Sequence, residues 1–197
     1  SFSNRDKKVI GKGITFSIGQ GYYLALTHVT SCELETKKLL PKSSFDNYRF
    51  TINNKQAKLI GRYEDISVFK VNSLDNASFV WGNSNNLDVG TRLVIIGNSF
   101  MKGTNVKVGL VSKLNITENF IKNSGIPNIH KKIFLTTTPI NFGDSGAPVF
   151  VIDFFGNYRL VGLVYAMYPS AHGMGFILKA NYVRDTINLI KQKNLLE

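Results

Sequence analysis

Short apolar or alternating stretches, separated by turn-forming residues, run through nearly the whole chain. Glycine and asparagine fill the breaks between them, as in Gly19-Gln20-Gly21 and Asn53-Asn54. Many short strands with turn signals between them are typical of an all-β barrel or sandwich. The stretches that we interpret as strands are 9–18, 22–27, 45–52, 56–63, 66–71, 92–97, 105–114, 133–138, 147–152, 158–167 and 175–178.

A polar segment divides these strands into two groups. We predict an N-terminal barrel over residues 1–75, an inter-barrel linker over 76–88 and a C-terminal barrel over 89–179. Residues 180–197 have apolar side chains at positions 183, 187 and 190, a spacing that predicts a helix with Asn181 as its N-cap. The 197 residues, of which 43% are hydrophobic, are enough to bury a sizeable core.

A serine between two glycines marks the candidate reactive centre, in the sequence Gly143-Asp144-Ser145-Gly146. The glycine two positions before the serine allows a sharp turn, after which the N–H groups of Gly143 and Ser145 can point the same way. Two such donors form an oxyanion hole, which stabilises the negative charge that develops during acyl transfer. The same residue types are also typical of an ordinary turn, so this segment alone does not decide the function.

Two polar residues upstream provide what a serine nucleophile needs: a base that takes its proton and a group that orients the base. His28 ends an apolar stretch in which a polar ring has no packing role, and Asp65 precedes the alternating strand 66–71. Singly, His28 is also compatible with a capped core histidine and Asp65 with a turn at a strand end. The chain order His28, Asp65, Ser145 is one of the orders found in serine catalytic triads.

Four groups of segments, in order over nearly the whole chain, resemble the trypsin/chymotrypsin-fold serine proteases, and most of all the bacterial HtrA (Deg) and V8-like branches. They are 11–29, which contains Leu26-Thr27-His28-Val29; 65–71; 94–98 with 108–112; and 143–149 with 160–163 and 173–178. The resemblance implies two six-stranded Greek-key barrels with the triad in the cleft between them and a C-terminal helix. It covers a protease domain, with no room left for the PDZ domain that follows the protease in most HtrA proteins.

The resemblance implies a serine endopeptidase that works through an acyl-enzyme. Ser145 is then the nucleophile and His28 the general base and later acid, while Asp65 holds the imidazole in the correct tautomer. Gly143 and Ser145 supply the oxyanion hole. In trypsins the acid that corresponds to Asp144 pairs with a new N-terminal ammonium, and Ser1-Phe2-Ser3 does not resemble such a terminus. We therefore expect Asp144 to pair with an Arg or Lys, or to stay solvated.

The same resemblance places seven residues around the pocket for the substrate's P1 side chain: Ile140, Asn141, Phe142, Leu163, Val164, Tyr165 and Ala166. No acidic residue lies in these segments before Asp144, which argues against selectivity for Lys or Arg. Glutamate-specific relatives carry a histidine where this chain has Leu163, so an acidic P1 residue is also disfavoured. We expect a small or medium apolar P1 residue.

Composition bears on partners and cofactors. Lys and Arg number 24 and Asp and Glu 13, a net charge of +11, which fits either a solvated basic surface or an acidic partner such as nucleic acid. The only cysteine, Cys32, excludes an intramolecular disulfide. No metal-binding motif and no phosphate-binding loop occurs, so we expect no metal and no cofactor. No stretch is long and apolar enough to span a membrane. A homotrimer is suggested by the resemblance alone, and the compartment stays open.

Other readings of the chain remain beside the protease. One is a trypsin-fold binding module that is catalytically silent or needs a ligand to become active, although the complete set His28, Asp65 and Ser145 argues against it. Another is a viral or phage processing protease associated with nucleic acid. An esterase of the α/β-hydrolase type is disfavoured because its order Ser, Asp, His is absent.

Overall fold

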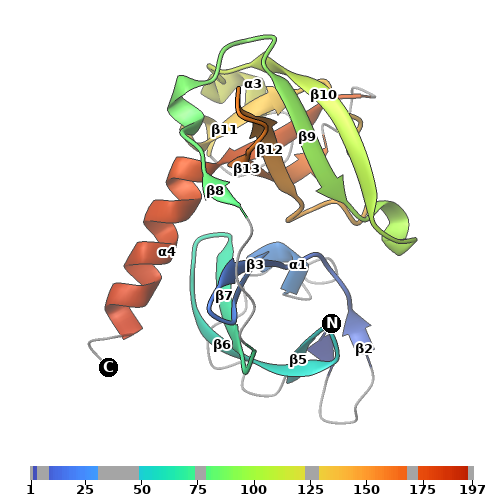
Figure 1. Ribbon diagram of the computed structural model, residues 1–197, viewed down its shortest axis with the longest axis vertical. Coiled ribbons are helices and arrows are strands. Elements are labelled where there is room, and N and C mark those ends of the chain that lie inside the picture. The colour runs from blue at the N-terminus through green and yellow to red at the C-terminus, as the bar shows by residue number, and fades with distance from the viewer. Residues whose placement is uncertain are drawn as a thin grey trace. The chain divides into compact units, whose positions relative to one another are not determined.

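The structure, a computed structural model, describes residues 2–3, 9–30, 49–73, 79–122, 129–167 and 173–194. It consists of two compact units, of which the first comprises Ser1–Ala77 with Thr186–Glu197 and the second Ser78–Asp185. Both units are built mainly of β-strands, and the chain's one long described helix, α4, lies at its C-terminal end (Figure 1). The predicted all-β class with a C-terminal helix is confirmed.

The first unit contains a seven-stranded antiparallel sheet in the order β2-β1-β5-β6-β7-β4-β3. Its core is formed by side chains of β4 to β7, among them Tyr23, Phe50, Phe69 and Val71. Phe50 and Phe69 contact each other with ring centroids 5.0 Å apart. The strands are β1 (Phe2–Ser3), β2 (Val9–Gly11), β3 (Phe16–Gly19), β4 (Tyr22–Leu26), β5 (Arg49–Ile52), β6 (Lys55–Tyr63) and β7 (Ile66–Val71).

The strand predicted over residues 9–18 is correct only at its two ends, β2 and β3, because the chain leaves the sheet between them. There it passes close to the helix that carries His28: a Cβ at Gly13 would lie 1.8 Å from Cγ1 of Val29. The predicted strand over 66–71 coincides with β7. The first part of the predicted strand 45–52 lies outside the described residues, as do Cys32 and His172.

The second unit contains a closed six-stranded barrel in the order β12-β9-β10-β11-β14-β13, in which β12 also pairs with β13. All pairings around the barrel are antiparallel, and β8 (Val80–Trp81) adds to β13 in parallel. The barrel interior is fully buried and includes Leu93, Ile95, Phe134, Val149 and Phe176. The barrel strands are β9 (Arg92–Gly97), β10 (Asn105–Lys113), β11 (Ile133–Thr136), β12 (Pro148–Ile152), β13 (Tyr158–Met167) and β14 (Gly175–Lys179).

Short helical segments connect these strands. Within the described part of the second unit these are η2 (Ser84–Asn86), η3 (Ser99–Met101), α3 (Glu118–Lys122) and η4 (His130–Lys132). Both β8 and η2 fall within residues 76–88, for which we predict a linker, and the boundaries of the two barrels stay a prediction.

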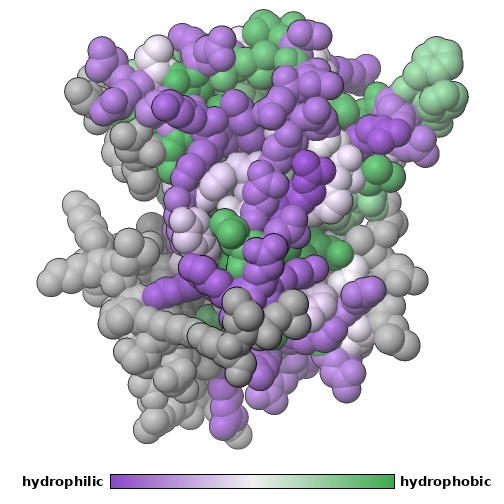
Figure 2. Space-filling model, turned by 90° about the vertical axis from the view of Figure 1, so that its left-hand side faces the viewer, coloured by the Kyte–Doolittle hydropathy of each residue, from purple (hydrophilic) through white to green (hydrophobic). Residues whose placement is uncertain are grey.

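Helix α4 (Ala180–Asn194) begins one residue before the position expected for its N-cap. Asn181 therefore lies in the first turn, where its side-chain oxygen accepts a hydrogen bond from the N–H of Ser84 at 3.0 Å. The apolar positions Val183, Ile187 and Ile190 are buried, as their spacing predicts. The side of the molecule on which α4 lies in Figure 1 faces the viewer in Figure 2, which shows mostly hydrophilic side chains there. None of the helices in the described ranges combines the length and apolar content that a membrane span requires.

Candidate active site

The first half of the candidate site lies in the first unit, where β4 and β7 meet. Their register pairs Leu26 with Ile66, which brings the residues after β4 beside those before β7. The N–H of Thr27 donates to the backbone oxygen of Asp65 at 2.8 Å, and the short helix α1 (Thr27–Thr30) then begins. The register of β4 with β7 thus places His28 next to Asp65, although 37 residues separate them in the sequence.

The carboxylate of Asp65 holds His28 through both of its oxygens. Oδ1 accepts the backbone N–H of His28 at 2.8 Å, and Oδ2 lies 2.5 Å from the ring nitrogen Nδ1. The two side chains are 34% and 24% exposed. Because an ionised carboxylate only accepts hydrogen bonds, it places the proton of a neutral imidazole on Nδ1 and makes Nε2 the nitrogen with the basic lone pair. This is the arrangement that a general base requires.

The second half of the candidate site is the loop before β12 in the second unit. Its turn is closed by two backbone hydrogen bonds, from the N–H of Asp144 to the oxygen of Asn141 at 3.1 Å and from the N–H of Ala147 to the oxygen of Asp144 at 2.9 Å. Gly143 has a φ of +91°, and a Cβ at this position would lie 2.7 Å from the backbone oxygen of Asn98. Conformation and close packing therefore both require glycine here.

The peptide bond before Gly143 is fixed in one orientation. The carbonyl of Phe142 accepts a hydrogen bond of 2.6 Å from the N–H of Phe100 in η3. The C=O and N–H of a trans peptide point in opposite directions, so the N–H of Gly143 points away from η3. Within the described part of the chain, the N–H groups of Gly143 and Ser145 have no hydrogen-bond acceptor. Two unused N–H donors flanking Asp144 are what an oxyanion hole needs.

Asp144 itself is fully buried and has an internal cation as its partner. Its carboxylate pairs with Nζ of Lys107, whose side chain is only 14% exposed. It also accepts the hydroxyl of Ser99 at 3.0 Å and the N–H of Asn141 at 2.8 Å. Of the two expectations for this residue, the ion pair is correct.

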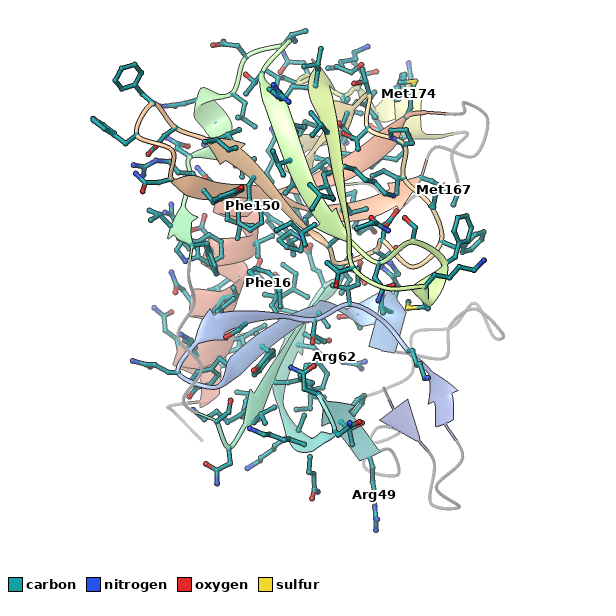
Figure 3. The ribbon with its side chains drawn as sticks, turned by 45° about the vertical axis from the view of Figure 1, so that its right-hand side comes forward. Phe16, Arg49, Arg62, Phe150, Met167 and Met174 are labelled. Carbon is teal, nitrogen blue, oxygen red and sulfur yellow. The ribbon has the colours of Figure 1, made fainter. Side chains whose placement is uncertain are left out.

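The segments predicted to surround the P1 side chain are brought together within the second unit. The N–H of Gly146 donates to the oxygen of Val164 at 2.8 Å, which joins the Ser145 loop to β13. Ile140 packs on β14, since a Cβ at Gly175 would lie 2.2 Å from Cγ1 of Ile140. Met167 ends β13 and Met174 precedes β14, and both lie in the same region in Figure 3.

These residues differ in how they can meet a substrate. The side chains of Leu163 and Val164 are fully buried, and Tyr165 and Ile140 are 6% and 8% exposed. Phe142, by contrast, is 71% exposed. Asn141 and Ala166 are partly exposed. A bound molecule can therefore contact the phenyl ring of Phe142 directly, whereas Leu163 and Val164 are inaccessible: the N–H and oxygen of Val164 already bond to Ala147 and Gly146.

The described residues contain no group of three or more His, Cys, Asp or Glu side chains that could hold a metal ion. His130 lies in η4 and is partly exposed. The structure thus places the candidate catalytic residues His28 and Asp65 together in one unit and the Ser145 loop in the other.

The family of trypsin-like peptidase domains matches residues 13–163, a range that contains His28, Asp65 and Ser145. The chain belongs to this family. A probable periplasmic serine endoprotease, DegP-like, from Pseudomonas fulva is 28% identical over 193 residues, which cover 95% of this chain and 36% of the relative. A DegP-like protein from Rickettsia conorii is 30% identical over 69% of the chain, and an HtrA-like serine protease from Staphylococcus aureus is 26% identical over 95%. The trypsin-like domain described here is thus HtrA-like.

Solved structures support the same fold for this trypsin-like domain. The HtrA-type protease AlgW with a decapeptide has a TM-score of 0.69 at 22% identity, over 94% of this chain and 52% of its own. Deg5 has a TM-score of 0.64 at 22% identity, over 95% of this chain and 85% of its own. The trypsin-like two-barrel fold is thereby confirmed. The chain spans between about a quarter and about a third of the length of the curated relatives named above.

Sequence reasoning missed three residues that support the Ser145 loop: Lys107, Ser99 and Phe100. The alternation of β10 points the wrong way for Lys107, because Val106 and Val108 have the pattern of inward-facing apolar positions. In the structure these valines are 66% and 48% exposed, and Lys107 lies on the other face. For Ser99 and Phe100 the sequence holds no signal.

Proposed function

We propose that the chain is a serine endopeptidase domain that cleaves peptide bonds through an acyl-enzyme. The observation that carries the proposal is the pairing of His28 with Asp65, which leaves Nε2 of the ring as a proton acceptor. The family match and the two unused N–H donors of Gly143 and Ser145 support it. His28, Asp65 and Ser145 together form the proposed triad.

In the proposed reaction, Nε2 of His28 takes the proton of the Ser145 hydroxyl as its oxygen attacks the carbonyl carbon of the scissile bond. The resulting oxyanion accepts hydrogen bonds from the N–H groups of Gly143 and Ser145. The imidazolium, stabilised by Asp65, then gives its proton to the leaving amine as the C–N bond breaks. In deacylation, His28 takes a proton from a water molecule as the water oxygen attacks the acyl carbon. His28 then returns this proton to the oxygen of Ser145 as the ester bond breaks and the acid product leaves.

For the P1 residue we propose a small or medium apolar side chain. Ile140 lies against Gly175, and none of the seven residues predicted to surround the P1 side chain is acidic and able to pair with Lys or Arg. The one buried carboxylate nearby, Asp144, is already paired with Lys107. A substrate's basic P1 side chain would therefore lose its hydration without gaining a counterion.

The substrate class is peptide or protein. AlgW, whose fold is similar, has been solved with a decapeptide and with a tripeptide. The exposed ring of Phe142 beside the Ser145 loop offers an apolar contact for such a chain. Nucleic acid as a further partner and a homotrimer stay predictions.

A fluorophosphonate probe tests this proposal because it reacts only with a serine that is activated by an assembled site. We expect the wild-type protein to be labelled, and labelling to be lost in Ser145→Ala and His28→Ala. Ser112→Ala and His130→Ala serve as matched controls and should be labelled like the wild type. A peptide library would then define the P1 preference.

A folded wild-type protein that is not labelled would contradict the proposal. It would favour instead a trypsin-fold binding module, or a protease that needs an activating ligand. Labelling that survives in Ser145→Ala would show that another serine reacts and would reject the proposed nucleophile.

A further inference from the structure

The carboxylate of Asp144 connects three stretches of chain that are distant in sequence. It contacts Lys107 from β10, Ser99 from η3 and the N–H of Asn141 from its own loop. Lys107 also donates to the backbone oxygen of Pro139 at 3.0 Å, so the same ammonium holds the loop at a second point. All of these groups belong to the second unit.

The burial of this carboxylate makes it depend on the cation. Asp144 is 0% exposed. Its oxygen Oδ1 packs closely against Gly97, since a Cβ at that position would lie only 2.5 Å from it. A buried carboxylate without a counterion is strongly disfavoured, so without Lys107 the side chain of Asp144 would turn toward water. Because Asp144 directly precedes Ser145 and directly follows Gly143, such a turn would move both oxyanion donors.

A second contact holds the same loop from η3. The N–H of Phe100 fixes the carbonyl of Phe142, and Phe100 and Met101 adopt positive φ values of 57° and 56°. Left-handed backbone in two successive non-glycine residues is costly and persists only where surrounding contacts maintain it. Ser99, the residue before them, donates its hydroxyl to Asp144. The buried ion pair therefore supports η3 and the oxyanion loop together.

We infer that Lys107 is a positioning residue that keeps the oxyanion loop in its active conformation through the buried carboxylate of Asp144. This inference rests on the proposed function. It adds that the ion pair between Lys107 and Asp144 keeps the oxyanion hole formed before a substrate binds. Since the cation comes from β10, the loop does not need the ammonium of a newly cut N-terminus.

The test compares Lys107→Met with Lys113→Met, which removes an exposed lysine from the same strand. For Lys107→Met we expect kcat on a peptide ester to fall about 30- to 100-fold, approaching the loss caused by removing one oxyanion donor. KM should change less than threefold, because the part of the predicted P1 region on β13 is held by its pairing with β12 and β14 and not by the ammonium. Lys113→Met should match the wild type.

Rescue separates positioning from a general structural role. In the double variant Lys107→Met/Asp144→Asn no charge is left buried, and the side-chain oxygen of an asparagine can still accept from Ser99 and Asn141. We expect its kcat to recover to within about fivefold of the wild type, since the charge and not the shape caused the loss. If Lys107→Met does not fold, Ser99→Ala replaces it, with an expected three- to tenfold loss of kcat at unchanged KM.

Hydrogen exchange of residues 139–147 gives a readout that does not require activity. We expect faster exchange in Lys107→Met than in the wild type and in Lys113→Met, and slower exchange again in the double variant. A folded Lys107→Met with wild-type kcat, or with wild-type exchange in this segment, overturns the inference. An inactive wild type whose loop still loosens in Lys107→Met would reject the proposed function and leave the positioning role supported.

Discussion

Asp65→Asn is the substitution that most directly tests how the imidazole is oriented. Oδ1 of Asp65 accepts the backbone N–H of His28, and Oδ2 faces Nδ1 of the ring. In the variant, the amide oxygen keeps the first contact, because the opposite orientation would point an NH2 group at an N–H donor. The NH2 group then faces Nδ1, which must become an acceptor, and the ring proton moves to Nε2. That tautomer cannot take the proton of Ser145.

The two effects of this substitution differ greatly in size. Loss of the correct tautomer in a serine triad lowers kcat about 10⁴-fold, which corresponds to about 5.5 kcal/mol in the activation free energy. Stability should change much less, by about 1 kcal/mol, because one hydrogen bond to a charged group is exchanged for one between neutral groups. We therefore expect the Asp65→Asn variant to be folded and almost inactive.

Rate constants for fluorophosphonate labelling, together with urea unfolding, measure both effects on the same preparations. Asp185→Asn is the matched control, since this aspartate is exposed on α4 and the substitution removes the same charge. Labelling of Asp65→Asn within tenfold of the wild type, with unfolding unchanged, would refute the assigned tautomer and with it the role of Asp65.

Three further outcomes follow from the second unit. Ile140→Ala should raise the ratio of kcat/KM for P1 Phe over P1 Ala by about tenfold or more, as judged with matched peptide substrates, because it frees space above Gly175. Gly175→Ala should lower the free energy of unfolding in urea by about 1–3 kcal/mol, since the new Cβ would overlap Ile140. The N–H of Asn157, with its side chain and Arg159, lowers the pKa of Asp153 from 3.8 to about 2. The ionised Asp153 therefore stabilises the folded state, fully above pH 3.8 and no longer once the pH has fallen through about 2. The difference in Tm between wild type and Asp153→Asn should shrink over that interval.

Local patterns were enough to predict much of the architecture. The strands 66–71, 92–97 and 158–167 coincide with β7, β9 and β13, because apolar stretches bounded by turn residues are read from neighbouring positions alone. The positions of His28 and Asp65 at strand ends also follow from local signals, whereas their contact depends on the long-range pairing of β4 with β7.

Features that depend on distant contacts could not be predicted in this way. The break between β2 and β3 arises where Gly13 passes close to Val29. Asn181 lies in the first turn of α4 and not at the N-cap, and its side chain accepts the N–H of Ser84, 97 residues away. The pairing of Asp144 with Lys107 likewise requires that β10 pass behind the Ser145 loop. A sequence pattern shows that a buried charge needs a partner, but the fold decides which cation reaches it.

The assignment of the end of α4 to the first unit has a consequence for how the chain is made. Lys191 lies over the ring of Tyr22 at 5.1 Å, and Lys193 over that of Tyr63 at 5.3 Å, so the last turns of this helix contact strands formed early in the sequence. The second unit is one uninterrupted stretch, whereas the first contains Thr186–Glu197 as well as its N-terminal strands. On the ribosome, the unit that is begun first is therefore the one completed last. An expression fragment that stops at residue 77 lacks these contacts, whereas one that spans 78–185 is continuous.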